Sequence, residues 1–176
     1  MQHVRFAFEA LVDRPELIVL LGITPNAPET EYGWIEPASS FRSGSETLFH
    51  VRRFIEKPSV EIARRMWAEG RCLWNSFVLI GRLWNLLALM IRTLPELCDT
   101  FAQSSWTLGT AFESEAVKQI YQAIGPVEFC GSVLTSRARD HVSVLPVSGL
   151  YWSDLGNPSR VLATMTHLGL RPEWIA

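Results

Sequence analysis

Apolar and polar positions alternate along the chain with two different periods, and the change from one period to the other predicts helices and strands in turn. Near the start, helical spacing is shown by Val4, Ala7, Phe8 and Leu11. Nearly continuous apolar runs, which are typical of strands, cover residues 17–23, 48–55, 72–80 and 141–147. The run at 72–80 has so few polar positions that we expect a strand buried on both faces.

Helix signals separate these runs. Ser59 is a good N-cap and Gly70 a good terminator, which predicts a helix over residues 59–69. Further helices are expected at residues 83–91, from Pro95 onwards, at 114–124 and at 159–168, and Ser132 is expected to cap one more turn. In the helix at 83–91 we expect the core positions to be Trp84, Leu87, Leu89 and Ile91.

Residues 24–45 are rich in Pro, Gly, Ser and Thr, which predicts a long connection with one short strand at 32–36. Elsewhere, strands alternate with helices. This order predicts an α/β fold in which helices cover both faces of a sheet.

Composition limits the classes of protein. With 176 residues, 48% apolar content and a formal charge of −2, the chain predicts a single domain over residues 1–176 with a substantial core. The near-neutral charge argues against nucleic acid as a partner. No apolar run approaches the ~20 residues that span a bilayer. Cys72, Cys98 and Cys130 match neither a disulfide framework nor a zinc site, so we expect ordinary core thiols and a cytoplasmic location.

Four sequence motifs follow one another along the chain: PETEYGWIE at 28–36, RFIEKP at 53–58, LWNS at 73–76 and YWSDLGNPSRV at 151–161. Together they resemble the sugar-phosphate nucleotidyltransferases, most closely the bacterial mannose-1-phosphate guanylyltransferases. The resemblance implies a Rossmann-like nucleotide-diphospho-sugar transferase fold, with a mixed sheet flanked by helices. It also implies an enzyme that joins a sugar 1-phosphate to a nucleoside triphosphate, with mannose 1-phosphate and GTP as the expected pair.

The resemblance also implies roles for individual residues. Lys57 would contact the sugar phosphate, Glu56 and Asn75 would contact sugar hydroxyls, and Gly33 would contact the sugar through its backbone. Asp154 would bind Mg²⁺, so that Lys57 and Asp154 are the expected catalytic residues.

Each of these residues also has an ordinary structural interpretation. Glu56 and Lys57 read equally well as a solvated surface pair, and Asp154 as a turn or helix-capping residue. Asn75 reads as a buried amide that is satisfied by the protein itself. Gly33 reads as a turn glycine.

Two features of that family are not found in the sequence. These are its glycine-rich phosphate loop, of the type GGxGTRLxP, and a second metal-binding Asp at an ADH-like strand end. We therefore expect an N-terminally truncated domain, the C-terminal sugar-phosphate-binding portion. An exposed strand edge or apolar face and a homo-oligomer would follow. The alternative function is a non-catalytic sugar-phosphate-binding or regulatory module. Phe77 replaces a glycine that is usual in the family, which predicts a more crowded pocket floor and leaves the sugar open.

Overall fold

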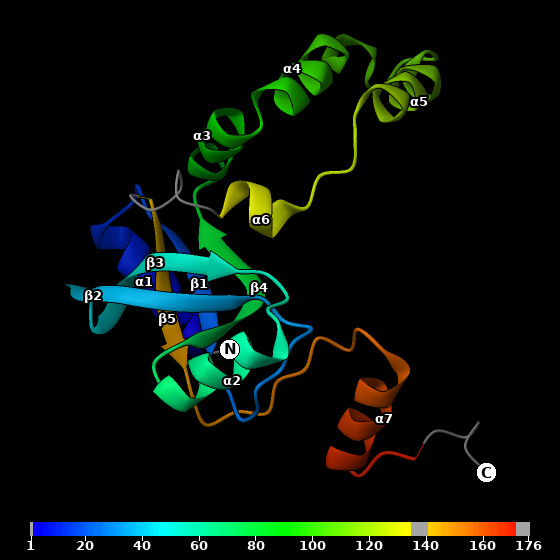
Figure 1. The fold of residues 1–176 in the computed structure, drawn as a ribbon. Helices are drawn as coiled ribbons and strands as arrows, with labels where there is room; N and C mark the ends of the chain where they lie inside the picture. The colour runs from blue at the N-terminus through cyan, green and yellow to red at the C-terminus, as the bar shows by residue number, and fades with distance from the viewer. Residues whose placement is uncertain (1, 135–140, 172–176) are drawn as a thin grey trace.

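The computed structural model describes residues 2–134 and 141–171 (Figure 1). In chain order its elements are α1 (Gln2–Asp13), β1 (Ile18–Ile23), β2 (Trp34–Ser43), β3 (Glu46–Ile55), α2 (Val60–Glu69), β4 (Leu73–Gly81), α3 (Leu83–Thr93), α4 (Pro95–Gln103), a short 3₁₀ turn η1 (Ser105–Thr107), α5 (Glu113–Ala123), α6 (Phe129–Val133), β5 (Val142–Val147) and α7 (Pro158–His167). Strands and helices do not alternate strictly, since β1, β2 and β3 follow one another, but the mixed sheet flanked by helices confirms the predicted α/β class.

The sheet is mixed, and its strands close into a ring in the order β1-β4-β2-β3-β5. β1 pairs in parallel with β5 and antiparallel with β4. The ring is closed by a short contact between β3 and β5, at Phe49–Val144 and His50–Ser143. We predicted an exposed strand edge or an exposed face. Each described strand has a neighbour on both sides, but β2 pairs with β4 only at Trp34–Trp74 and Ile35–Leu73, so the rest of β2 pairs with β3 alone.

Two apolar cores lie on opposite faces of β1, whose six residues are all buried. Leu17, Val19 and Leu21 face a core that includes residues of α1 and α2. Ile18 and Leu20 face a second core, to which α3 and α6 contribute. The predicted covering of both sheet faces by helices is therefore confirmed.

The segment between β1 and β3 differs from the prediction. Instead of a short strand at 32–36 within a long connection, β2 runs for ten residues and turns directly into β3. Gly44 makes this turn with a φ of 58°, and its N–H donates to Asp13 Oδ2. Pro37 sits where the register shifts, so its missing N–H is tolerated. Pairing with β3 thus overrides the turn-like composition of this segment.

Two predicted buried surfaces are exposed instead. In β4 the stretch from Ser76 to Leu79 is not fully buried, and Phe77 is 58% exposed, before Ile80 is buried again, so the prediction of a strand buried on both faces along its length is wrong. In α3 only Leu89 of the four predicted core positions is buried, while Trp84 is 75% exposed. The cause is visible in Figure 1, where α3, α4 and α5 form an arm that extends away from the sheet.

The predicted helix boundaries are confirmed in one case and shifted in another. Ser59 caps α2 by accepting a hydrogen bond from the Ile62 N–H, and Gly70 ends α2 in the left-handed conformation, as predicted. The turn that we assigned to Ser132 begins earlier. Glu128 caps α6 there, because its carboxylate accepts from the N–H groups of Cys130 and Gly131.

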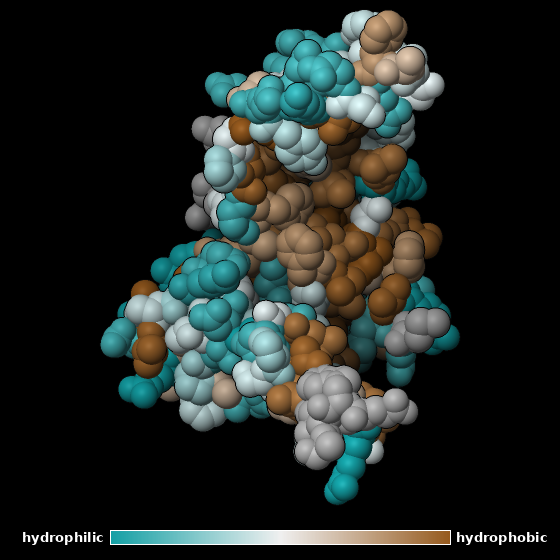
Figure 2. All heavy atoms as spheres, turned by 90° about the vertical axis from the view of Figure 1, so that its right-hand side faces the viewer, coloured by the Kyte–Doolittle hydropathy of each residue, from teal (hydrophilic) through white to brown (hydrophobic). Residues whose placement is uncertain are grey.

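Apolar side chains gather on one face of the molecule beneath the arm (Figure 2). On the arm itself, Phe101, Tyr121 and Val127 line one hollow, and each is at least 45% exposed. An exposed apolar face was predicted and is present; the homo-oligomer that we inferred from it stays a prediction. No helix in the described ranges is long and apolar enough to cross a bilayer.

Gly22 provides a test of the packing inside the sheet. A Cβ atom at this position would lie 2.6 Å from Val144 Cγ2 and 2.7 Å from Leu73 Cδ1, so Gly22→Ala overpacks the core. We expect a loss of about 1–3 kcal/mol in the free energy of unfolding. Thermal melting measures it. The matched control is Gly125→Ala, because a Cβ there meets nothing within 4 Å and the melting temperature should stay the same. Equal effects of the two substitutions would contradict the packing described for β1.

Candidate functional site

One pocket brings together all the residues that the sequence singled out: Gly33, Glu56, Lys57, Asn75 and Asp154. Its volume is about 430 Å³, and it lies where the end of β3 and the loop leading into α2 meet β4 and the loop after β5. The remaining lining residues are Glu31, Tyr32, Ser76, Phe77, Cys130, Trp152 and Ser153. The structure thus places the predicted residues together, while their roles stay predictions.

A close approach of three segments forms the floor of this pocket. The Asn75 N–H donates to the Gly33 carbonyl at 2.7 Å, which extends the short pairing of β2 with β4. A Cβ atom at Gly33 would lie 2.6 Å from Phe54 Cζ and 2.7 Å from Glu56 Oε2. A side chain at Gly33 would therefore have to displace the Phe54 ring and the Glu56 carboxylate, so glycine here allows the β3 end to pack closely.

The Asn75 side chain is buried and partly satisfied by the protein. Its Oδ1 accepts from the Phe77 N–H at 3.0 Å, and its Nδ2 lies 3.5 Å from Cys130 Sγ, to which it donates. A primary amide has two N–H donors, so one remains for a ligand hydroxyl. Asn75 is thus a buried amide that is bonded within the protein, and the same bonds orient its remaining N–H, which stays a predicted donor to a sugar hydroxyl.

Glu56 and Lys57 follow directly on β3 and line the pocket from one side. Lys57 has a φ of 42°, an uncommon conformation for a residue with a side chain. Desolvation raises the pKa of the Glu56 carboxyl, and the nearby charge of Glu128 raises it further. Glu56 is thus more than a solvated surface residue.

Cys130 and Glu128 approach Glu56 from α6. Within the described part of the chain, these three residues are the group whose potential metal-ligand atoms all lie within 4.8 Å of one another. Burial raises the pKa of the Cys130 thiol to about 12, so it is protonated near neutral pH. The Glu128 carboxylate already accepts two backbone N–H groups of α6. These properties favour a polar pocket wall over a metal site.

An aromatic cluster holds the loop after β5 against the sheet. Tyr32 packs edge-to-face with Trp74 and with Trp152, each at 5.0 Å between ring centroids. Trp34 packs against Trp74 at 6.1 Å. Because Trp152 is only two residues from Asp154, this cluster fixes the carboxylate at the pocket edge.

The Asp154 carboxylate is the predicted Mg²⁺ ligand, and in this structure both of its oxygens are already engaged. Arg160 Nη1 donates to Oδ1 and to Oδ2, each at 3.0 Å, and the Gly156 N–H donates to Oδ1 at 2.9 Å. A divalent cation on this carboxylate would meet the positive charge of the guanidinium at close range. The arrangement therefore does not fit Mg²⁺ at Asp154, and Mg²⁺ itself stays a prediction from the resemblance.

Phe77 borders the pocket with a φ of 59°. Its ring packs edge-to-face on Phe129 at 5.7 Å between centroids. An aromatic side chain in this backbone conformation is strained, and such residues persist where the surroundings impose them. The predicted crowding beside Asn75 is consistent with this position, and its effect on the choice of sugar stays a prediction.

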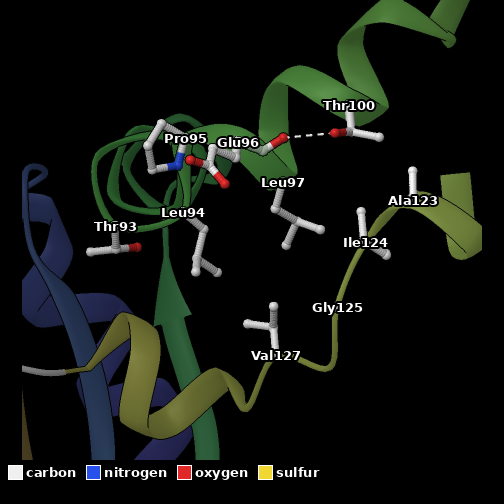
Figure 3. A pocket seen from close by; sticks show the side chains of 10 residues that line it. All are labelled: Thr93, Leu94, Pro95, Glu96, Leu97, Thr100, Ala123, Ile124, Gly125 and Val127. Atoms are coloured by element: carbon white, nitrogen blue, oxygen red, sulfur yellow. Dashed lines mark hydrogen bonds between the residues drawn. The ribbon is translucent and has the colours of Figure 1, made fainter.

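A second hollow of about 400 Å³ lies in the arm, between the α3–α4 corner and the segment after α5 (Figure 3). Apolar side chains such as Leu94, Leu97 and Val127 dominate its lining. The hydrogen bond drawn there, from Thr100 Oγ1 to the Glu96 carbonyl, is internal to α4. None of the residues singled out by the sequence lies here, so we assign the site to the first pocket.

Three contributors to the site were not predicted. We interpreted Cys130 as a simple core thiol and gave no role to Glu128 or Arg160. Arg160 belongs to a motif that carried the resemblance, and its spacing of six from Asp154 across a helix start was a usable signal. Cys130 and Glu128 offered none, because only the docking of α6 brings them to the pocket.

Comparison with known proteins shows which family this chain is similar to. The profile of the family described as "Nucleotidyl transferase" matches residues 2–169. The chain is 35% identical over 82 residues to a mannose-1-phosphate guanylyltransferase of Klebsiella pneumoniae. The matched segment covers 47% of this chain and 17% of that protein. It is 28% identical over 152 residues to one of Escherichia coli strain K12, which covers 85% of this chain and 31% of that protein.

A solved structure from Thermus thermophilus, described as a mannose-1-phosphate geranyltransferase, superposes with a TM-score of 0.67 at 24% identity. The match covers 89% of this chain and 43% of that chain, and it confirms the predicted fold. This chain spans less than a third of the length of the curated relatives named above. Since the family profile covers nearly all of its residues, the chain belongs to the nucleotidyl transferase family.

Proposed function

We propose that the pocket binds a sugar 1-phosphate, and that the chain serves as the sugar-phosphate-binding part of a guanylyltransferase that joins mannose 1-phosphate to GTP. The observation that supports this proposal best is the convergence of Gly33, Glu56, Lys57, Asn75 and Asp154 on one cavity of about 430 Å³. That volume lies within the range of small-ligand sites. The curated relatives named above are mannose-1-phosphate guanylyltransferases, which supports the choice of substrates.

The lining offers a complementary group for each part of a sugar phosphate. Lys57 supplies a compact positive charge for the phosphate oxygens. The free Asn75 N–H donates to one hydroxyl, and the Glu56 carboxylate accepts from others. Gly33 lines the same cavity and would contact the sugar through its backbone, next to the Glu56 carboxylate.

In the proposed reaction, an oxygen of the sugar phosphate attacks the α-phosphorus of GTP. The new P–O bond forms as the bond to the β-phosphate oxygen breaks, and pyrophosphate leaves with the electron pair. Lys57 would offset the negative charge of the attacking phosphate and hold it in line. Mg²⁺, which the resemblance implies, would supply further charge neutralisation, but we assign it no step because Asp154 is paired with Arg160.

The alternative is a module that binds a sugar phosphate without turnover. The Asp154–Arg160 ion pair favours it, since it occupies the one carboxylate that was predicted to hold a metal. Both functions require the same sugar-phosphate contacts, so activity distinguishes them and binding does not.

Lys57→Ala tests the phosphate contact. Loss of one charge-assisted contact costs about 1.5–3 kcal/mol, which corresponds to about a tenfold to hundredfold weaker Kd for mannose 1-phosphate. Isothermal titration calorimetry measures this change. Lys118→Ala is the matched control, because Lys118 is the other lysine in the sequence and lies exposed on α5, away from the pocket. If both variants bind like the parent, the pocket is not the phosphate site.

Pyrophosphate release tests turnover by this chain alone. A cavity of about 430 Å³ suits one small ligand better than a sugar phosphate together with a nucleoside triphosphate. We therefore expect mannose 1-phosphate to bind while GTP, mannose 1-phosphate and Mg²⁺ together give no release above a Lys57→Ala blank. Robust release that disappears in this blank would show that the chain is an enzyme by itself.

The pH dependence of stability tests the environment of Glu56. Its pKa is raised, so the folded state binds this proton more tightly than the unfolded state, and the resulting stability is lost as the pH rises above about 4.5. Glu56→Gln removes this loss. We expect its melting temperature to exceed that of the parent increasingly between about pH 4 and pH 7.

Glu61→Gln is the control for this series. The pKa of Glu61 is lowered, because its own backbone N–H and the Ser59 hydroxyl donate to its carboxylate. Its effect on the melting temperature should therefore have the opposite sign as the pH rises. A gain for Glu56→Gln that does not vary with pH would contradict the raised pKa.

A further inference from the structure

Arg160 is a largely buried cation at the edge of the pocket. It lies in the first turn of α7, and its side chain is only 15% exposed. Three side chains surround its guanidinium. Nη1 contacts both oxygens of Asp154 at 3.0 Å, Nη2 lies 3.3 Å from Glu29 Oε1, and Cζ lies 4.5 Å above the ring of Tyr32. An arginine with two carboxylates and an aromatic face is held in one position.

The backbone around Asp154 is arranged to support this pair. Leu155 has a φ of 54°, which turns the chain so that the Gly156 N–H reaches back to Asp154 Oδ1. Asn157 then caps α7 by accepting from the Arg160 N–H at 3.0 Å. Carboxylate and guanidinium are therefore both positioned by the same turn, and their contact does not depend on a flexible side chain alone.

A divalent cation needs the positions that these groups occupy. Mg²⁺ binds carboxylate oxygens at about 2.0–2.1 Å, so on Asp154 it would share its ligand oxygens with the guanidinium, which donates to both of them. Two positive groups at such a separation repel each other strongly in a partly buried site. The polar atoms of Glu29 and the ring of Tyr32 hold Arg160 from its far side, so it is not free to swing away without losing these contacts as well.

We propose that Arg160 acts as a built-in cation at Asp154, which excludes divalent metal ions from this carboxylate while the pair is intact. Asp154 is then the anchor of α7 and holds a fixed positive charge beside the sugar-phosphate pocket, and metal binding at Asp154 requires the release of Arg160. This inference concerns the same pocket as the proposed function but does not depend on the identity of the substrate.

Manganese titration followed by ¹H–¹⁵N NMR tests the inference without any activity measurement. Mn²⁺ stands in for Mg²⁺ and broadens nearby resonances, and the Gly156 amide is a local reporter because it donates to Asp154. In Arg160→Gln we expect this amide to broaden at a Mn²⁺ concentration about tenfold lower than in the parent. Adding Asp154→Asn to this variant should return the sensitivity to that of the parent.

Two further variants separate charge from structure. Arg160→Lys retains a cation at this place, so its Gly156 amide should keep the low sensitivity of the parent even if the docking of α7 loosens. Glu29→Gln removes another contact of Arg160 but leaves the Asp154 pair in place, so it should also behave like the parent.

The inference is overturned by either of two results. In one, the parent is already as sensitive to Mn²⁺ as Arg160→Gln and loses this sensitivity on Asp154→Asn, which would mean that Asp154 is open to metal. In the other, Arg160→Gln gains no sensitivity although its melting temperature and the Gly156 chemical shift show that the loop is folded, which would mean that Arg160 is not the excluding group.

Discussion

The pocket depends on one backbone contact, the hydrogen bond between the Asn75 N–H and the Gly33 carbonyl. Only two residue pairs join β2 to β4, and this bond continues the pairing into the loop before β2. It brings two motifs that are distant in sequence into direct contact. Phe54 and Glu56, from the end of β3 and just after it, occupy the space where a Cβ of Gly33 would lie. The polar lining is thus a consequence of close backbone packing, and each side chain is oriented by it.

The parts of this arrangement that follow from local chemistry could be read from the sequence. Ser59 and Gly70 delimit α2 through a hydroxyl cap and a left-handed glycine, both of which depend on neighbouring residues only. The site residues were found because they belong to four motifs in a familiar order. The length of β2, the closure of the strands into a ring and the approach of Cys130 depend on contacts between distant segments. No local pattern of apolar positions encodes such contacts. The prediction that one face of α3 is buried in the core failed for the same reason, because the pattern does not show that α3 extends away from the sheet.

Strained backbone conformations lie at the proposed ligand pocket and next to it. Among the described residues, the non-glycine positions with a positive φ are Lys57, Phe77 and Leu155. Two of them line the pocket, and the third shapes the turn that follows Asp154. Conformations of this kind cost of order 1–3 kcal/mol each and persist only where the rest of the fold imposes them. The aromatic cluster of Tyr32, Trp74 and Trp152 and the pairing of the strands supply that constraint, so the rigid part of the molecule supports the strained part.

The parallel pairing of β1 with β5 has a consequence for the order in which the chain acquires its structure. β1 is synthesised well before its parallel partner β5, because the whole arm of α3, α4 and α5 lies between them in the sequence. Until β5 emerges from the ribosome, one side of the most buried strand has no neighbour, although the β2–β3 hairpin can already form. A topology with such distant partners has a high contact order and folds slowly. The buried strand β1 therefore gains its parallel neighbour only after the arm has been synthesised, and its apolar side chains stay exposed on that side until then.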